Sequence, residues 1–148
     1  MKRREFFKQL GSVAVVAATI SPTMSFAASA PKSANALSYK DALNAITGGK
    51  KPATSSKVKL KVPEIAENGA VVPLQVTSDL AGKTVAIFQD ANPESLVAVF
   101  TVPANGIIDF KIRIKMAKTG NVTAVVQDGN TLYSHTKEVK VTAGGCGG

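Results

Sequence analysis

The stretch "IIDFKIRIKM" (residues 107–116) decides the fold class of this chain. Apolar side chains occupy every second position from Ile108 to Met116, and charged side chains occupy the positions between them. A period of two places the apolar side chains on one face of a β-strand and the charged side chains on the other. The stretch therefore predicts a strand with one face in a core and one face in solvent.

The same period recurs in "KVKLKVP" (57–63), where three valine and leucine side chains alternate with three lysines. Further strand-like runs are "AVVPLQVT" (70–77), "KTVAIFQDA" (83–91), "LVAVFTV" (96–102), "NVTAVVQD" (121–128) and "TLYSHTKEVKVT" (131–142). Turn residues such as Asn105-Gly106 and Thr119-Gly120-Asn121 separate them. Seven short strands predict an all-β, antiparallel β-sandwich over residues 57–142. Pro73 indicates an edge strand or a bulge, and the apolar run 83–91 fits a core or a partner interface equally.

A segment rich in small and polar residues precedes the strands. We expect a leader over residues 28–56 with a short helix at 38–47, because Ser38 can cap a helix, Asp41 suits its first turn and Gly48-Gly49 can end it. Residues 50–56 are expected to form a polar linker.

The N-terminus has the layout of an export signal. Basic residues, Arg3 and Arg4 among them, precede an apolar run at 10–20 and a cleavage position after Ala27. Eleven apolar residues are too short to span a bilayer, so we expect no stable membrane anchor. The arginine pair, followed by Glu5-Phe6-Phe7-Lys8, resembles a twin-arginine signal, with general secretion as the alternative. Residues 1–27 therefore predict a removed signal peptide and a periplasmic protein.

The charge of the exported chain remains basic. Removal of residues 1–27 takes away four of the 18 basic and one of the 10 acidic residues, which leaves a net charge of +5. Nucleic acid is not an expected partner for an exported protein. A basic surface serves either solubility or attraction of anionic substrates and partners, and the sequence leaves both interpretations open.

Most catalytic constellations are absent from the sequence. His135 is the only histidine, and we expect it to be a hydrogen-bonded residue of the sheet rather than a ligand. The chain has no Cys-x-x-Cys, haem-attachment or phosphate-binding motif. The carboxylates fall at turns or on solvent faces: Asp90, Glu94, Asp109 and Asp128. We therefore expect no metal site, no cofactor and no enzymatic activity of its own.

The single cysteine, Cys146, lies in the segment "AGGCGG" (143–148), between Gly144, Gly145, Gly147 and Gly148. An unpaired thiol is unusual in an oxidising compartment. Glycines make the segment flexible and narrow, and four residues extend about 13 Å beyond Thr142. The thiolate is a nucleophile and a redox centre. These features predict a flexible arm that carries a covalent adduct to partner enzymes; alternatives are an intermolecular disulfide between structural modules and a frayed terminus.

Three segments resemble the SoxY family, the sulfur-carrier subunits of the thiosulfate-oxidising Sox system. They are "VPEIAENGAVVPLQV" (62–76), "RIKMAKTGNVTAVVQDG" (113–129) and "KEVKVTA" (137–143), the last leading into "GGCGG". The resemblance runs from about Ala42 to Gly148. It implies an immunoglobulin-like sandwich that forms a heterodimer with SoxZ, a second β-sandwich subunit.

The resemblance also implies a function for the arm. Cys146 is then the sole attachment point, and the four glycines form a swinging arm. The haem protein SoxAX couples thiosulfate to the cysteine as an S-thiosulfonate, and the metal-dependent hydrolase SoxB removes the terminal sulfone as sulfate. SoxCD, where present, oxidises the remaining sulfane sulfur. The carrier itself needs no cofactor beyond the bound sulfur species.

Overall fold

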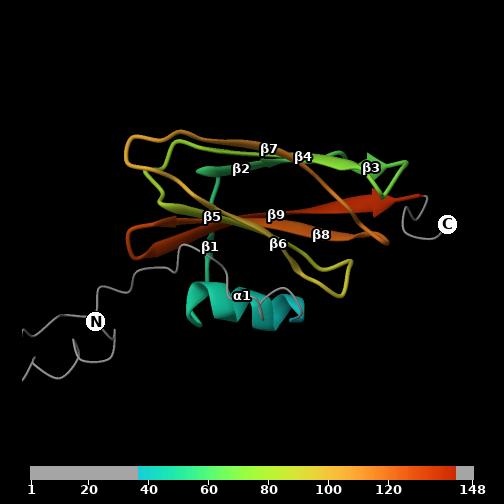
Figure 1. The fold of residues 1–148 in the computed structure, drawn as a ribbon, viewed down its shortest axis with the longest axis horizontal. Coiled ribbons are helices and arrows are strands. Elements are labelled where there is room, and N and C mark those ends of the chain that lie inside the picture. Colours follow the sequence, from blue (N-terminus) through green and yellow to red (C-terminus); the bar gives the residue numbers. More distant parts are fainter. Residues whose placement is uncertain (1–36, 143–148) are drawn as a thin grey trace, which may run out of the picture.

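A computed structural model describes residues 37–142, which form two β-sheets packed face to face with one helix on the outside (Figure 1). The larger sheet has the order β1 (Ala53–Thr54), β9 (Thr131–Val141), β8 (Gly120–Asp128), β5 (Thr84–Gln89), β6 (Leu96–Thr101), with β3 (Ile65–Ala66) also pairing with β9. The smaller sheet has the order β2 (Val58–Lys61), β4 (Val72–Ser78), β7 (Ile108–Ile114).

The predicted β-sandwich is confirmed, and each of the seven expected runs contains one strand. Strands β2, β4 and β7 in one sheet and β9, β8, β5 and β6 in the other give an immunoglobulin-like arrangement. The seven expected strands pair antiparallel, and two further strands that the sequence analysis does not predict, β1 and β3, pair with β9 in parallel. Both strands have two residues, which is too short for an alternating pattern to be visible in a sequence.

The core lies between the two sheets and consists of the inward-facing residues of each strand. The alternation that defines 107–116 is confirmed, with Ile108, Ile114 and Met116 buried and the charged residues between them exposed. Phe110 and Ile112 are only half-buried because β7 is at the edge of its sheet. The largest fully buried members of this core include Val58, Val72, Val76, Val85, Ile87, Val122, Val126 and Val139.

A second apolar cluster lies on the outer face of the larger sheet, under helix α1 (Tyr39–Thr47). The Ser38 side chain accepts a hydrogen bond from the Asp41 amide at 3.4 Å, and Gly48 ends the helix with φ of 64°. Ala42 and Ile46 pack in the same cluster as Phe88. Strand β5 is therefore buried on both faces. One face of the run 83–91 packs in the core between the sheets, and the other packs under helix α1. Helix α1, in the segment that the sequence analysis assigns to the leader, thus packs on the sandwich.

The position of Pro73 differs from the expectation of an edge strand or a bulge, since β4 pairs with β7 in unbroken register. Strand β4 is central in the smaller sheet. Pro73 pairs with Arg113 of β7, but β2 ends at Lys61, opposite Gln75, before it reaches Pro73. A proline is tolerated here because one side of β4 has no neighbouring strand at this point.

Two side-chain contacts close the sides of the sandwich. Nδ1 of His135 on β9 lies 2.7 Å from the carbonyl oxygen of Val58 on β2. On the opposite side, the rings of Phe100 on β6 and Phe110 on β7 stack with centroids 4.3 Å apart. Each contact joins strands of different sheets, and the Phe100–Phe110 stack joins two edge strands. His135 is thus a hydrogen-bonded residue of the sheet, as the sequence indicates.

Candidate functional site at the end of the C-terminal strand

The residues predicted to carry function lie outside the described range. Cys146, Gly144, Gly145, Gly147 and Gly148 follow residue 142, and Arg3 and Arg4 precede residue 37. What the structure describes is the strand from which the predicted arm departs. That strand, β9, is the longest of the described strands and pairs with β8 over nine residue pairs.

The backbone amides of residues 140–142, at the end of β9, donate three hydrogen bonds to neighbouring segments. The Lys140 amide donates to the Glu64 carbonyl at 2.9 Å, and the Thr142 amide donates to the Ala66 carbonyl at 3.1 Å. Between them, the Val141 amide donates to Oγ1 of Thr119 at 2.9 Å. The first two bonds come from the parallel pairing with β3, which lies beside the tip of β9 (Figure 1). The base of the predicted arm is therefore fixed as far as Thr142.

The turn that contains Thr119 is itself held from a second side. Oδ1 of Asp90 accepts a hydrogen bond from the Asn121 amide at 2.6 Å, and Oδ2 accepts one from the Asn121 side chain at 2.9 Å. Gly120 lies against the same carboxylate, since a Cβ at this position would be 2.5 Å from Oδ1 of Asp90. Asp90 thus positions the turn that contacts β9.

The three segments that carry the family resemblance meet at this place. Residues 62–76 supply the carbonyl groups of Glu64 and Ala66, residues 113–129 supply Thr119, and residues 137–143 include the strand end that these groups bind. Sequence reasoning identified Thr119-Gly120-Asn121 only as a turn and missed its contact with β9. The contact joins residues 22 positions apart, a pairing that periodicity does not indicate.

Other kinds of site are not found in the described range. Among residues 37–142, no group of three or more His, Cys, Asp or Glu side chains is placed to hold a metal ion. The single described helix, α1, does not have the length and apolar character needed to cross a bilayer.

Comparisons with known proteins agree with the resemblance. The family described as "Sulfur oxidation protein SoxY" matches residues 43–146, a range that includes Cys146. The solved structure of the sulfur carrier protein SoxY from Chlorobium limicola f thiosulfatophilum is 40% identical, with a TM-score of 0.64. The match covers 68% of this chain and 89% of that chain. An engineered protein of known structure is 13% identical, with a TM-score of 0.41, over 60% of this chain and 21% of that chain. No curated protein matches the chain.

Proposed function

Because the chain belongs to the SoxY family of sulfur-oxidation proteins, we propose that it is a periplasmic carrier that holds sulfur intermediates covalently on Cys146 during thiosulfate oxidation. The carrier is not itself an enzyme, and partner enzymes act on the bound intermediate. A signal at residues 1–27 with Arg3-Arg4 directs the chain through the twin-arginine route.

The chemistry starts at the thiolate of Cys146. The thiolate sulfur bonds to the outer sulfur of thiosulfate, giving a cysteine S-thiosulfonate, and two electrons pass to a haem protein of the SoxAX type. Water then attacks the sulfonate sulfur at a SoxB-type hydrolase, which releases sulfate and two protons and leaves a persulfide on the cysteine. A SoxCD-type enzyme, where present, oxidises the remaining sulfane sulfur. An exposed thiolate supplies the nucleophile for the first step.

The observation that carries this proposal is the family match through Cys146 together with the fixed base of the arm. Three hydrogen bonds hold residues 140–142, and the glycines begin two residues later, at Gly144. From such a base, four residues of extended chain can carry the cysteine sulfur at most about 13 Å from the sandwich. This reach supports entry of the sulfur into the active site of another protein.

We propose that the stable partner is a SoxZ-like β-sandwich subunit. Strand β6 lies at the edge of the larger sheet and, among residues 37–142, pairs only with β5. Four of its six residues are half-buried. An open sheet edge is stabilised when another chain covers it, which supports association with a second sandwich.

Intact-protein mass spectrometry tests the carrier function directly. Protein isolated from cells grown on thiosulfate is expected to carry thiosulfonate, sulfane or polysulfide adducts on Cys146, and a Cys146→Ser variant should not support thiosulfate oxidation. A chain that is always unmodified, or a functional Cys146→Ser variant, would exclude the carrier role. A constitutive disulfide-linked dimer on non-reducing gels, without any sulfur adduct, would instead favour a structural module.

A further inference from the structure

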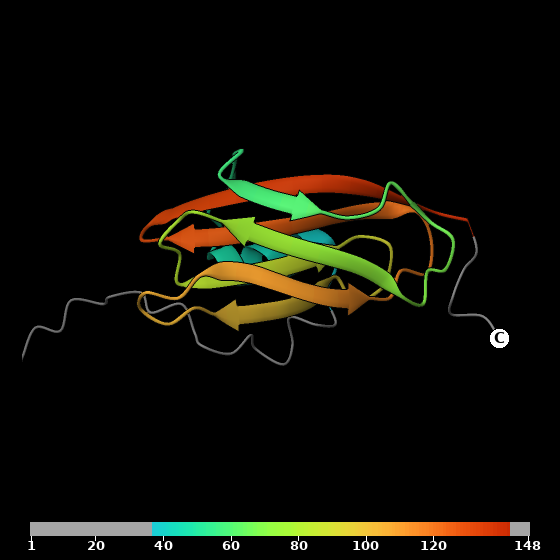
Figure 2. The ribbon, with the colours of Figure 1, turned by 90° about the horizontal axis from the view of Figure 1, so that it is seen from above.

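The outer face of the smaller sheet carries two rows of cations, one on each of its edge strands β2 and β7. The four cations that face outward there are Lys59, Lys61, Lys111 and Arg113. Asp109 is the one carboxylate among the outward-facing residues of β2, β4 and β7. Helix α1 covers the other sheet, and none of residues 37–142 forms a layer over this cationic face (Figure 2). Within the described chain, the face is therefore open to another molecule.

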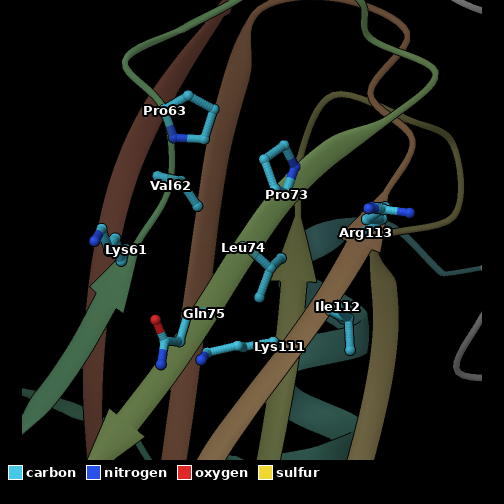
Figure 3. Close-up of a pocket in the computed structure, with 9 residues that line it drawn as sticks. All are labelled: Lys61, Val62, Pro63, Pro73, Leu74, Gln75, Lys111, Ile112 and Arg113. Atoms are coloured by element: carbon cyan, nitrogen blue, oxygen red, sulfur yellow. The ribbon is translucent and has the colours of Figure 1, made fainter.

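Strand β4 forms a neutral strip between the two rows. Its outward-facing residues on this strip are Pro73, Gln75 and Thr77. In the sheet register, Gln75 lies between Lys61 of β2 and Lys111 of β7 (Figure 3). Neighbouring strands are about 5 Å apart, so the two rows lie about 10 Å apart. Within each row the cations are two residues apart along a strand, which is a distance of about 7 Å.

A groove of about 820 Å³ opens at one end of this strip, where β2 stops and β4 continues (Figure 3). Its lining residues are Lys61, Val62, Pro63, Pro73, Leu74, Gln75, Lys111, Ile112 and Arg113. Three of the four cations thus line the groove, and the two prolines and three aliphatic side chains form the rest of its wall with Gln75. The groove offers apolar contact together with positive charge.

We propose that the cationic face binds an extended acidic segment of a partner protein, which lies along β4 between the two rows. Side chains of an extended segment point alternately to opposite sides, and those on one side recur about every 7 Å. This repeat equals the spacing of the cations within each row. Carboxylates at successive positions can therefore pair alternately with the lysines of β2 and with the cations of β7, through charge-assisted hydrogen bonds.

The spacing of the charges favours a peptide segment over a small anion or a lipid surface. A small oxyanion contacts one row only, because the rows lie about 10 Å apart. Lipid headgroups have no fixed spacing, and a flat bilayer leaves the groove unfilled. A segment of about five extended residues, by contrast, spans the strip from Thr77 to Pro73, and its side chains can enter the groove.

Asp109 determines which end of the face attracts the acidic segment more strongly. It lies opposite Thr77 in the sheet register, and its Oδ1 accepts a hydrogen bond from Nε2 of Gln75 at 2.7 Å. Its charge repels a carboxylate at this end of the β7 row. The acidic residues of the segment should therefore concentrate at the other end, over the groove.

The contact is separate from the arm but lies near its base. Pro63, which lines the groove, is three residues from Ala66 and so at most about 10 Å away. The Ala66 carbonyl accepts a hydrogen bond from the Thr142 amide. A partner bound at the cationic face is thus held beside the arm by a contact that does not involve Cys146. The inference goes beyond the carrier function, and neither requires the other.

The expected affinity is modest, because all four cations are exposed. Exposed charge pairs each change a binding constant by a factor of roughly 1.4 to 5. Salt screens exposed charges, so the affinity should fall as ionic strength rises. Binding of this strength is reversible and allows the protein to leave one partner for another.

The test uses the full chain with Cys146→Ser, which prevents disulfide formation, and a peptide of one tryptophan followed by six glutamates. The chain has no tryptophan, so the fluorescence anisotropy of the peptide reports binding directly. We expect binding at low ionic strength that shifts the backbone amide signals of Lys61, Gln75 and Lys111 in NMR spectra. The matched peptide with six glutamines should bind at least about tenfold more weakly, since it lacks every charge pair.

Matched variants identify the two rows as the cause. Lys61→Gln combined with Lys111→Gln removes one cation from each row and should weaken binding of the glutamate peptide by roughly 2- to 25-fold. Lys40→Gln combined with Lys50→Gln removes the same charge on the helix side and should change the affinity by less than a factor of about 1.4. Asp109→Asn keeps an oxygen for Gln75 but removes the repulsion, so it should strengthen binding by roughly 1.4- to 5-fold.

Three results would overturn the proposal. Equal weakening in both double variants would show that only the net charge of the chain matters. Inorganic sulfate that shifts the same amides as strongly as the peptide, at equal total charge, would show a site for small anions. Co-sedimentation with phosphatidylcholine vesicles that contain about 30% phosphatidylglycerol, without binding of the peptide, would assign the face to a lipid surface. Because the tested chain lacks Cys146, none of these results bears on the carrier function, which fails separately if cells never form an adduct on that cysteine.

Discussion

The backbone amide of Val141 donates a hydrogen bond to Oγ1 of Thr119 at 2.9 Å, one residue before the described chain ends. Thr119 belongs to a turn that Asp90 holds through Asn121. The chain that enters the arm is therefore fixed to the sandwich by a side chain as well as by the parallel pairing with β3. A carrier arm with a fixed base sweeps a defined volume, which favours delivery of the cysteine to one place on a partner.

Replacement of Thr119 by Val should release the end of β9 without unfolding the domain. The variant keeps the shape of the side chain but loses the oxygen that accepts from Val141. We expect a loss of stability of about 0.5–1.5 kcal/mol and faster amide hydrogen exchange at Val141 and Thr142. Thr101→Val, at an exposed position on β6, is the control. Unchanged exchange at Val141 would show that Thr119 does not hold the strand.

Gly120→Ala tests the packing of the same turn against Asp90. The added Cβ would lie 2.5 Å from Oδ1 of Asp90 and 2.9 Å from Cβ of Ala91, so the turn must shift. We expect a destabilisation of about 1–3 kcal/mol, measured by chemical denaturation. The Asp90→Ala/Gly120→Ala double variant should lose less stability than the sum of the losses in the two single variants, because no carboxylate is left to clash with the new Cβ. Additive losses would contradict this contact.

His135 should stabilise the sandwich by joining its two sheets. The carbonyl oxygen of Val58 can only accept, so Nδ1 of His135 must carry the proton at their 2.7 Å contact. His135→Ala removes the donor, and we expect a loss of about 1 kcal/mol in the free energy of unfolding. His135→Asn, whose side-chain amide retains an N–H donor, should lose less stability than His135→Ala. If both variants are as stable as the native chain, the contact contributes nothing to folding.

The helix should contribute to the stability of the whole domain. Ile46 is 7% exposed and belongs to the cluster that includes Phe88 and Leu96. Ile46→Ala is expected to cost about 2–4 kcal/mol, seen as a lower midpoint in a single cooperative unfolding transition. Asn44→Ala, at an exposed position on the same helix, should have little effect. A sandwich that unfolds at its usual midpoint despite Ile46→Ala would show that the helix does not contribute to the stability of the domain.

The sequence predicted those parts of the fold that repeat a local pattern. Strand β7 alternates strictly because one face meets the core and the other meets solvent, and helix α1 has a capping serine and an ending glycine at its bounds. Strand β5 shows no alternation because the sandwich covers one face and α1 covers the other. Its continuous apolar run could not reveal which surfaces would cover it.

The sequence predicts the chemistry of the candidate site but not its surroundings. The position of Cys146 between glycines predicts a carrier arm, and this prediction falls on residues outside the described range. The base of that arm depends on Ala66 and Thr119, which lie 76 and 23 residues before Thr142 in the sequence. Contacts over such separations form only when strands from different parts of the chain align. The cationic face likewise depends on β2 and β7 lying on either side of β4.

Arm length should limit processing by partner enzymes and not the reactivity of the thiol. Deletion of Gly144 and Gly145 shortens the reach of Cys146 by about 7 Å, roughly half of its extent beyond Thr142. The rate of Cys146 with a small neutral thiol reagent should change less than twofold, because a small molecule does not require the full reach of the arm. Loading from thiosulfate by the proposed haem-protein partner should fall at least tenfold, because a shortened arm would not reach a reaction centre set back from that partner's surface.

A matched variant separates length from composition. Gly144→Ser combined with Gly145→Ser keeps the number of residues and should retain most of the enzymatic loading rate, since serine adds little bulk. Both variants keep the base of the arm unchanged. In each, the Thr142 amide still donates to the Ala66 carbonyl and the Val141 amide still donates to Oγ1 of Thr119. If the shortened arm is loaded as fast as the native one, the reaction takes place at the surface of the partner, and the function of the glycines is not to extend the reach of Cys146.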